Sequence, residues 1–188
     1  MDHIKEIKEI CSKAAKPLLE VSIIGVKSYN IFKIDCKDLE DYESSYRVWE
    51  AEKFKDIFSQ LKIITGPVVY WFEIVSDLNN EKIILELKKY ISLGDCKSVP
   101  ALKKNIIFNT KALYVGKVKA RFQGRLIQHL GYYKVKATQG LQLCYWTKNL
   151  SLQFNIHVYE FENDMADLMP IVENALAKEL KPLIGKHK

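Results

Sequence analysis

The spacing of apolar side chains has a helical period in five segments of the chain. In residues 3–19 apolar positions recur every three or four residues and form one stripe of a helix. The sequence predicts four further helices, at residues 46–61, 81–91, 123–130 and 164–180. Pro170 falls inside the last of these, where a proline fits either the first turn or a break.

A period of two marks the strands. Within residues 150–161 apolar residues occupy alternate positions, which is the pattern of a half-buried strand. The β-branched and aromatic run at 68–75 follows Gly66-Pro67 and predicts a second strand, and residues 106–116 predict a strand or hairpin. From Gly66 onward the order strand, insertion, strand, helix, loop, strand, helix predicts an α+β layer fold with a small sheet.

Residues 1–65 precede these elements and are interpreted as an N-terminal extension with both helix and strand. Two short β-type runs in residues 21–34 predict a hairpin around Lys27 and Ser28. The acidic residues 35–46 predict a loop that leads into the second helix.

Charge is distributed unevenly along the chain. The net charge is +6, yet residues 1–95 hold 17 acidic against 14 basic side chains. Residues 96–159 hold 11 Lys and Arg and neither Asp nor Glu. A segment of this sign attracts phosphate groups, which favours a polyanion such as DNA as partner. A solvated basic surface without a partner fits the charge equally well, so other features must decide.

Composition is that of a globular protein, with 48% hydrophobic and 28% charged residues over 188 positions. No apolar run approaches the roughly eighteen residues that a membrane span needs. Residues 1–16 lack the apolar core of a secretory signal. The four scattered cysteines contain no C-x-x-C pair, and we expect them to be thiols. These features predict a cytoplasmic protein that does not use a membrane.

Four short motifs follow Gly66 in a set order, each on a predicted element. They are Val68-Val69-Tyr70, Tyr114-Val115-Gly116-Lys117, the helical pair Arg125 and His129, and Glu173 followed by the segment KPLIGK at 181–186. The ordered set resembles the GIY-YIG nuclease family over roughly residues 66–187. The resemblance implies a domain at 66–188 with a three-stranded, mostly antiparallel sheet flanked by helices, interrupted by an insertion at 71–113.

The resemblance also implies the roles of individual residues. Tyr70 and Tyr114 would reach one site and bind or activate the attacking water, and we favour Tyr114 as the base. Arg125 and His129 would hold the scissile phosphate, and Glu173 would bind one Mg²⁺ or Mn²⁺ ion. The candidate DNA-binding side chains of the basic segment are Lys117, Lys119 and Arg121.

Residue chemistry is compatible with these roles. Arg125 and His129 lie four positions apart and project from one helix face, although the pair alone favours a solvated face and only the flanking motifs favour a site. Arginine grips a phosphate through two hydrogen bonds. One carboxylate at Glu173, with waters and a phosphate oxygen, suits Mg²⁺. A phenol titrates near pH 10, so a tyrosine base needs nearby cations. His157, on the polar side of its strand, is interpreted as a surface residue.

Three features depart from the family pattern. Val68 stands where the first motif has glycine, and the linker between the two tyrosine motifs is much longer than usual. Gly185 stands where many members have an asparagine after the K-P segment, which removes a side chain from the site. Asn174 and His187 are the candidates to replace it.

We therefore expect a metal-dependent DNA endonuclease that hydrolyses phosphodiester bonds. The main alternative is a nucleic-acid-binding protein that keeps the fold without turnover, and Gly185 is the argument for it. A third class is a protein-interaction module whose acidic N-terminal half covers its own basic face. Residues 1–65 and 71–113 would select a DNA sequence, form a homodimer or pack against the core.

Overall fold

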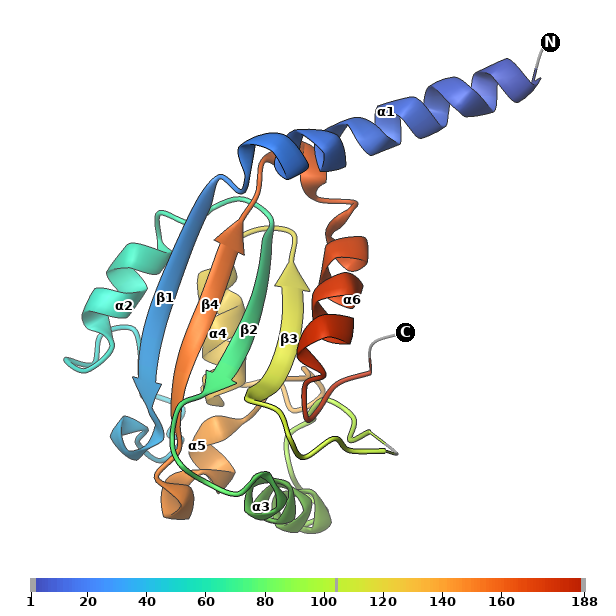
Figure 1. The fold of residues 1–188 in the computed structure, drawn as a ribbon. Helices are drawn as coiled ribbons and strands as arrows, with labels where there is room; N and C mark the ends of the chain where they lie inside the picture. Colours follow the sequence, from blue (N-terminus) through green and yellow to red (C-terminus); the bar gives the residue numbers. More distant parts are fainter. Residues whose placement is uncertain (1–2, 104, 187–188) are drawn as a thin grey trace.

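The computed structural model describes residues 3–103 and 105–186 and contains one four-stranded antiparallel sheet. The strand order is β1-β4-β2-β3 (Figure 1). The strands are β1 (Ser28–Asp35), β2 (Val68–Ile74), β3 (Ala112–Val118) and β4 (Gln153–Glu160). The α+β class follows the prediction, but the sheet has four strands where the family resemblance implies three.

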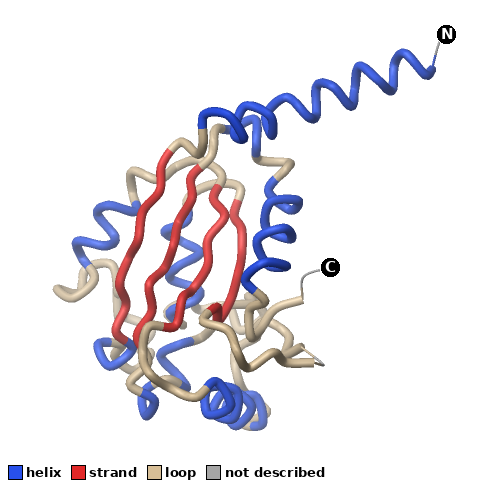
Figure 2. Tube along the Cα trace, viewed as in Figure 1, coloured by secondary structure: helices blue, strands red, loops and turns tan. Residues whose placement is uncertain are grey.

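Helices flank both faces of this sheet. They are α1 (His3–Ile24), α2 (Lys55–Leu61), α3 (Asn80–Ser92), α4 (Phe122–Leu130), α5 (Leu143–Trp146) and α6 (Met169–Leu180). The tube in Figure 2 shows α4 behind the strands and α6 along the side of β3. Most of the core lies between the sheet and α4, and a second cluster lies under α6 and the end of α1.

The register of the sheet explains the alternating pattern of β4. Phe72 of β2 and Phe32 of β1 flank Ile156 of β4, and all three side chains are buried on the face that meets α4. Because neighbouring residues point to opposite faces, the polar positions between them lie on the other face. The half-buried strand predicted for residues 150–161 is therefore confirmed.

The hairpin predicted for residues 21–34 is wrong. Residues 21–24 continue α1, which ends at Ile24. Gly25 follows it with a φ of 85°, which suits a glycine, and its N–H donates to the Val21 carbonyl at 2.9 Å. Leu18 and Val21 pack against Phe161 and the residues around it. This tertiary contact stabilises a helix where the β-branched residues favoured a strand.

Two further predicted elements are shorter than their patterns suggest. Within 46–61 only α2 is an α-helix, and the turns before it carry the buried side chains of Val48 and Phe54 into the core. Within 106–116 regular pairing begins at Ala112. In the first segment turns bury apolar residues without a longer helix, whereas in the second Ile107 and Phe108 precede the strand and are exposed.

The N-terminal extension is part of the same sheet. β1 pairs with β4 along its whole length, and Phe32 and Ile34 are buried. The N-terminal half of α1, by contrast, projects away from the body (Figure 1). No helix in the described ranges is long and apolar enough to cross a membrane.

A buried lysine attaches the insertion to the rest of the molecule. The Lys97 ammonium donates to the carbonyls of Gly131 at 2.9 Å and Tyr133 at 2.7 Å. It also lies 3.7 Å from the centre of the Tyr42 ring, which is a cation–π contact. The insertion therefore packs against both the segment after α4 and the N-terminal extension.

Glu160 anchors the turn before β2. Its Oε1 accepts from the N–H groups of Thr65 at 3.1 Å and Gly66 at 2.9 Å and pairs with Lys27 at 3.3 Å, while Oε2 accepts from Ser28 at 3.0 Å. Burial opposes ionisation, but the hydrogen bonds from Gly66, Ser28 and Lys27 hold the pKa of this carboxyl below its usual range.

We expect Glu160→Gln to lower the free energy of unfolding by about 1.5–3 kcal/mol at pH 7, because hydrogen bonds to a charged acceptor are lost. The folded-state pKa lies below the unfolded value near 4.3, so this stabilisation is full above that pH. It is lost as the pH falls through the folded-state pKa. Denaturant unfolding at pH 7 and below pH 4 should show the gap between wild type and variant closing. The exposed Glu162→Gln is the control, and a gap independent of pH would contradict the assignment.

Candidate functional site

Three residues from two of the motifs meet between the sheet and α4. The hydroxyl of Tyr70, on β2, lies 2.7 Å from Nε2 of His129, and Nε of Arg125 donates to the same hydroxyl at 3.1 Å. Arg125 and His129 lie one turn apart on α4, so the helix presents both to β2, as their spacing predicts. Tyr70 and His129 are fully buried, and Arg125 is partly buried.

The tautomer of His129 is set by the backbone. The N–H of Leu141 donates to Nδ1 at 3.2 Å, so Nε2 carries the proton of the neutral ring and donates to Tyr70. Burial, with the charge of Arg125 as a second cause, lowers the pKa of His129 well below its usual range. His129 is therefore neutral near pH 7 and donates to Tyr70 from a fully buried position.

Tyr70 lies behind the site instead of facing it. Burial is the main cause that raises the pKa of Tyr70, Tyr114 adds to it, and the nearby Arg125 only partly offsets the rise. Its side chain has no exposed surface. In this structure Tyr70 is thus a neutral phenol whose oxygen accepts from two donors, and the expectation that it contacts the attacking water does not match its position.

The glycine of the second motif makes room for Tyr70. Gly116 is the direct cross-strand partner of Tyr70. A Cβ atom at 116 would lie 2.5 Å from the Tyr70 hydroxyl oxygen and 2.7 Å from Cε1 of Tyr114. Val68, which replaces the glycine of the first motif, is buried in the core without such a restriction. Packing therefore requires a glycine at position 116 of the second motif but not at position 68 of the first.

Arg125 is held rigidly. Its Nη1 donates to Oε1 of Gln128 at 2.8 Å and to the carbonyl of Gln139 at 2.6 Å. Burial opposes the charge, but interactions with Tyr70 and Tyr114 raise the pKa of Arg125. The guanidinium is therefore a permanent positive charge in a defined orientation beside both tyrosines.

A cavity of about 240 Å³ lies next to this cluster. It is lined by Pro100, Ala101, Tyr114, Gln139, Glu173, Gly185 and Lys186. Tyr114 connects the cavity to the buried residues, since its ring centre lies 5.2 Å from that of His129 and 6.2 Å from that of Tyr70. The five predicted catalytic residues thus lie within one region, with Tyr114 and Glu173 at the cavity and the other three beside Tyr114.

Glu173, the predicted metal ligand, forms an ion pair with Lys117 through Oε2. The two side chains are 13% and 33% exposed, so the pair is largely shielded from water. Within the residues that the structure places, no three His, Cys, Asp or Glu side chains form a metal-binding group. One carboxylate fits a largely hydrated Mg²⁺ ion, but the ion must compete with Lys117.

The other two predicted DNA-binding residues face solvent. Lys119 pairs with Asp167 at 2.7 Å, and the two side chains are 71% and 89% exposed. Arg121 is exposed just before α4. Exposed ion pairs contribute little to stability, so a phosphate can replace Asp167 as the partner of Lys119 at small cost.

The acidic N-terminal half neutralises the basic segment only locally. Lys136 pairs with Asp95 at 2.6 Å, and Lys148 pairs with Asp41. Both aspartates are highly exposed. An interaction module with a covered basic face would require such contacts between the two halves of the chain. Because both are exposed surface pairs, they neutralise the basic segment only at these points.

Gly185 occupies the wall of the cavity. Its N–H donates to the carbonyl of Ala101 at 3.0 Å, and its φ is 101°. Side chains rarely adopt this backbone conformation, so an asparagine at 185 would carry strain. Asn174 is not among the lining residues of the cavity, and His187 lies outside the described residues.

Sequence reasoning missed the part of the site that comes from loops. Gln139, Lys186 and the insertion residues Pro100 and Ala101 line the cavity. An antiparallel bridge between Leu102 and Ile184 brings the insertion to the C-terminal segment. No local pattern in the sequence predicts this bridge, because its two sides are far apart in the chain.

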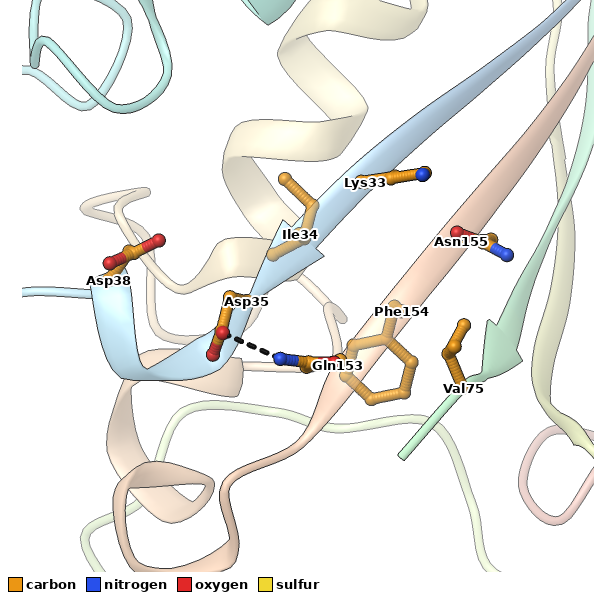
Figure 3. Close-up of a pocket in the computed structure, with 8 residues that line it drawn as sticks. All are labelled: Lys33, Ile34, Asp35, Asp38, Val75, Gln153, Phe154 and Asn155. Carbon is orange, nitrogen blue, oxygen red and sulfur yellow. Dashed lines mark hydrogen bonds between the residues drawn. The ribbon is translucent and has the colours of Figure 1, made fainter. Parts of the chain in front are cut away.

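A larger cavity, of about 440 Å³, lies at the ends of β1 and β4 (Figure 3). Its carboxylates already have partners: Asp35 accepts from Gln153 at 2.8 Å and pairs with Lys37, and Asp38 pairs with Lys53. No residue of the four motifs lines it. We therefore place the candidate site at the smaller cavity beside Tyr114.

His157 is more than a surface residue. Its ring stacks on Trp71 with centres 4.3 Å apart and planes 9° apart, and its Nε2 lies 3.0 Å from a carboxylate oxygen of Glu73. Its side chain is only 12% exposed. The polar face of the sheet therefore carries a packed aromatic row that alternation alone did not reveal.

Comparisons with protein-family models, with curated proteins and with solved structures give no match to this chain.

Proposed function

We propose that this protein is a metal-dependent DNA endonuclease that hydrolyses phosphodiester bonds. The observation that carries the proposal is the convergence of the four motifs, which are separated in the chain by up to about a hundred residues, on one cluster. Tyr70, Arg125 and His129 contact one another, and Tyr114 joins them to a cavity that Glu173 also lines. The resemblance of the ordered motifs to the GIY-YIG family supports the same function.

The charges around the cavity suit a phosphate. Lys186 lines the cavity, and Lys117 forms an ion pair with Glu173, which also lines it. The carbonyl of Gln139, another lining residue, accepts a hydrogen bond from the guanidinium of Arg125. Three cations thus lie at or next to the cavity that Glu173 lines. Because the guanidinium is held before substrate arrives, it can stabilise charge that develops on the phosphate without reorganisation.

The two tyrosines have different tasks in this proposal. Tyr114 lines the cavity and orients the attacking water, whereas Tyr70 and His129 hold Arg125 and Tyr114 from behind. Glu173 would hold one divalent ion, which would stabilise the charge on the phosphate and the leaving oxygen. Lys119 and Arg121 would contact the DNA backbone at the surface.

A nucleic-acid-binding protein without turnover is the second candidate. Two observations favour it: Gly185 supplies no side chain to the cavity, and Lys117 occupies the carboxylate of Glu173. A binding protein of this kind would use Lys117, Lys186 and Arg125 to bind phosphates.

Supercoiled plasmid distinguishes the two functions. We expect nicking in Mg²⁺ or Mn²⁺ that stops when a chelator is added. Tight DNA binding without nicking in either metal would exclude the endonuclease and establish the second candidate. Absence of both binding and nicking would exclude both.

A further inference from the structure

The ion pair between Lys117 and Glu173 joins the side chain that would bind a phosphate to the side chain that would bind a metal ion. Lys117 projects from β3 opposite Val69, on the sheet face covered by α6, and Glu173 comes from α6 itself. A carboxylate only 13% exposed is costly without a partner, and Lys117 supplies one. The lysine therefore acts as an internal counter-ion for the carboxylate.

A divalent cation and the lysine ammonium compete for this carboxylate. The ammonium is tethered to the adjacent strand, so its effective concentration at Glu173 is high. A hydrated cation in this cavity would meet the carboxylate of Glu173, which is the one acidic side chain among the described residues that line it. The metal alone should consequently bind weakly.

A phosphate changes this competition in two ways. It offers Lys117, which is 33% exposed and has a flexible stem, a second anion beside Glu173. It also provides an oxygen ligand that a cation can share with the carboxylate. The neighbouring Lys186 adds positive charge on the same cavity and favours entry of the phosphate.

From these contacts we propose that Lys117 couples nucleic-acid binding to metal binding: a backbone phosphate draws Lys117 from Glu173 and thereby opens the carboxylate to a divalent cation. The inference rests on the proposed function, since it takes Glu173 as the metal ligand and a DNA phosphate as the entering anion. Because binding linkage is reciprocal, the cation should tighten DNA binding by the same factor. The site would then be loaded with metal chiefly on DNA.

The first test needs no DNA. Binding of Mn²⁺ to the full chain is followed by the paramagnetic resonance signal of the free ion. Lys117→Met should bind Mn²⁺ at least tenfold more tightly than wild type, and the double variant Lys117→Met/Glu173→Gln should lose that gain. Lys119→Met is the matched control, because it breaks the exposed pair with Asp167 on the same strand end and should change Mn²⁺ affinity less than twofold.

The second test measures the coupling. Fluorescence anisotropy of a labelled short DNA duplex, with a chelator and then with Mn²⁺, gives the factor by which the cation tightens DNA binding. In wild type, Mn²⁺ should tighten DNA binding by a factor at least five times larger than in Glu173→Gln. The factor measured in Glu173→Gln accounts for ions held by the DNA itself. In Lys117→Met this excess should fall below twofold, since the carboxylate is already open.

Thermal unfolding shows whether each variant is folded, and Lys117→Gln replaces Lys117→Met should the latter fail to fold. Mn²⁺ affinity in a folded Lys117 variant no higher than in Lys119→Met would overturn the coupling, whether or not wild type nicks plasmid. A tenfold gain with no plasmid nicking would instead support the coupling and count against the endonuclease.

Discussion

Glu173→Gln should reduce plasmid nicking at least a hundredfold while DNA binding without metal stays near that of wild type or tightens slightly. The substitution keeps the side-chain volume and removes the charge that would hold the divalent ion, and loss of one main charge-stabilising group costs catalysis about 10²–10³-fold. It also releases Lys117 from its ion pair, so a cation becomes available for phosphate. Initial rates of nicking and metal-free anisotropy measure the two effects separately.

Glu179→Gln, an exposed position near the end of the same helix, is the control for loss of one negative charge from α6. It should leave nicking within about twofold of wild type. Normal nicking by a folded Glu173→Gln protein would show that the metal ligand is assigned wrongly. Equal losses in both variants would point to the overall charge of the helix instead.

Gly116→Ala should lower the free energy of unfolding by about 1–3 kcal/mol, the usual cost of an added methyl group in a packed core. The new Cβ would lie 2.5 Å from the Tyr70 hydroxyl oxygen, so the ring must move away from His129 and Arg125. Nicking should fall with it, because Arg125 loses one of the groups that hold it. Denaturant unfolding and nicking assays on the same preparation test both effects.

The chain offers a matched glycine for comparison. Gly124 lies inside α4, and a Cβ there would meet nothing within 4 Å. Gly124→Ala should therefore stabilise the protein by up to about 1 kcal/mol through helix propensity alone. If the two substitutions shifted stability equally, the close approach of Tyr70 to Gly116 would not be the cause.

Local patterns determined much of the fold. The alternation in residues 150–161 predicted β4, and Gly66-Pro67 marked the start of β2, because side chains of a strand report directly which face is buried. The same logic failed at residues 21–24, where an apolar run fits a strand and a helix equally well and packing against Phe161 decided for the helix. The sequence predicted a β-type run in the residues of β1, but it did not predict that this strand pairs with β4.

The sequence by itself determined which chemical groups the candidate site contains: the helical spacing of Arg125 and His129, the two tyrosine motifs, and a carboxylate on the last helix. The tertiary structure decided what each group faces. It buries Tyr70, joins Lys117 to Glu173 and closes the cavity with the insertion. The reason is physical: periodicity and turn chemistry act over a few residues, whereas burial and ion pairing depend on segments brought together only when the sheet and helices pack.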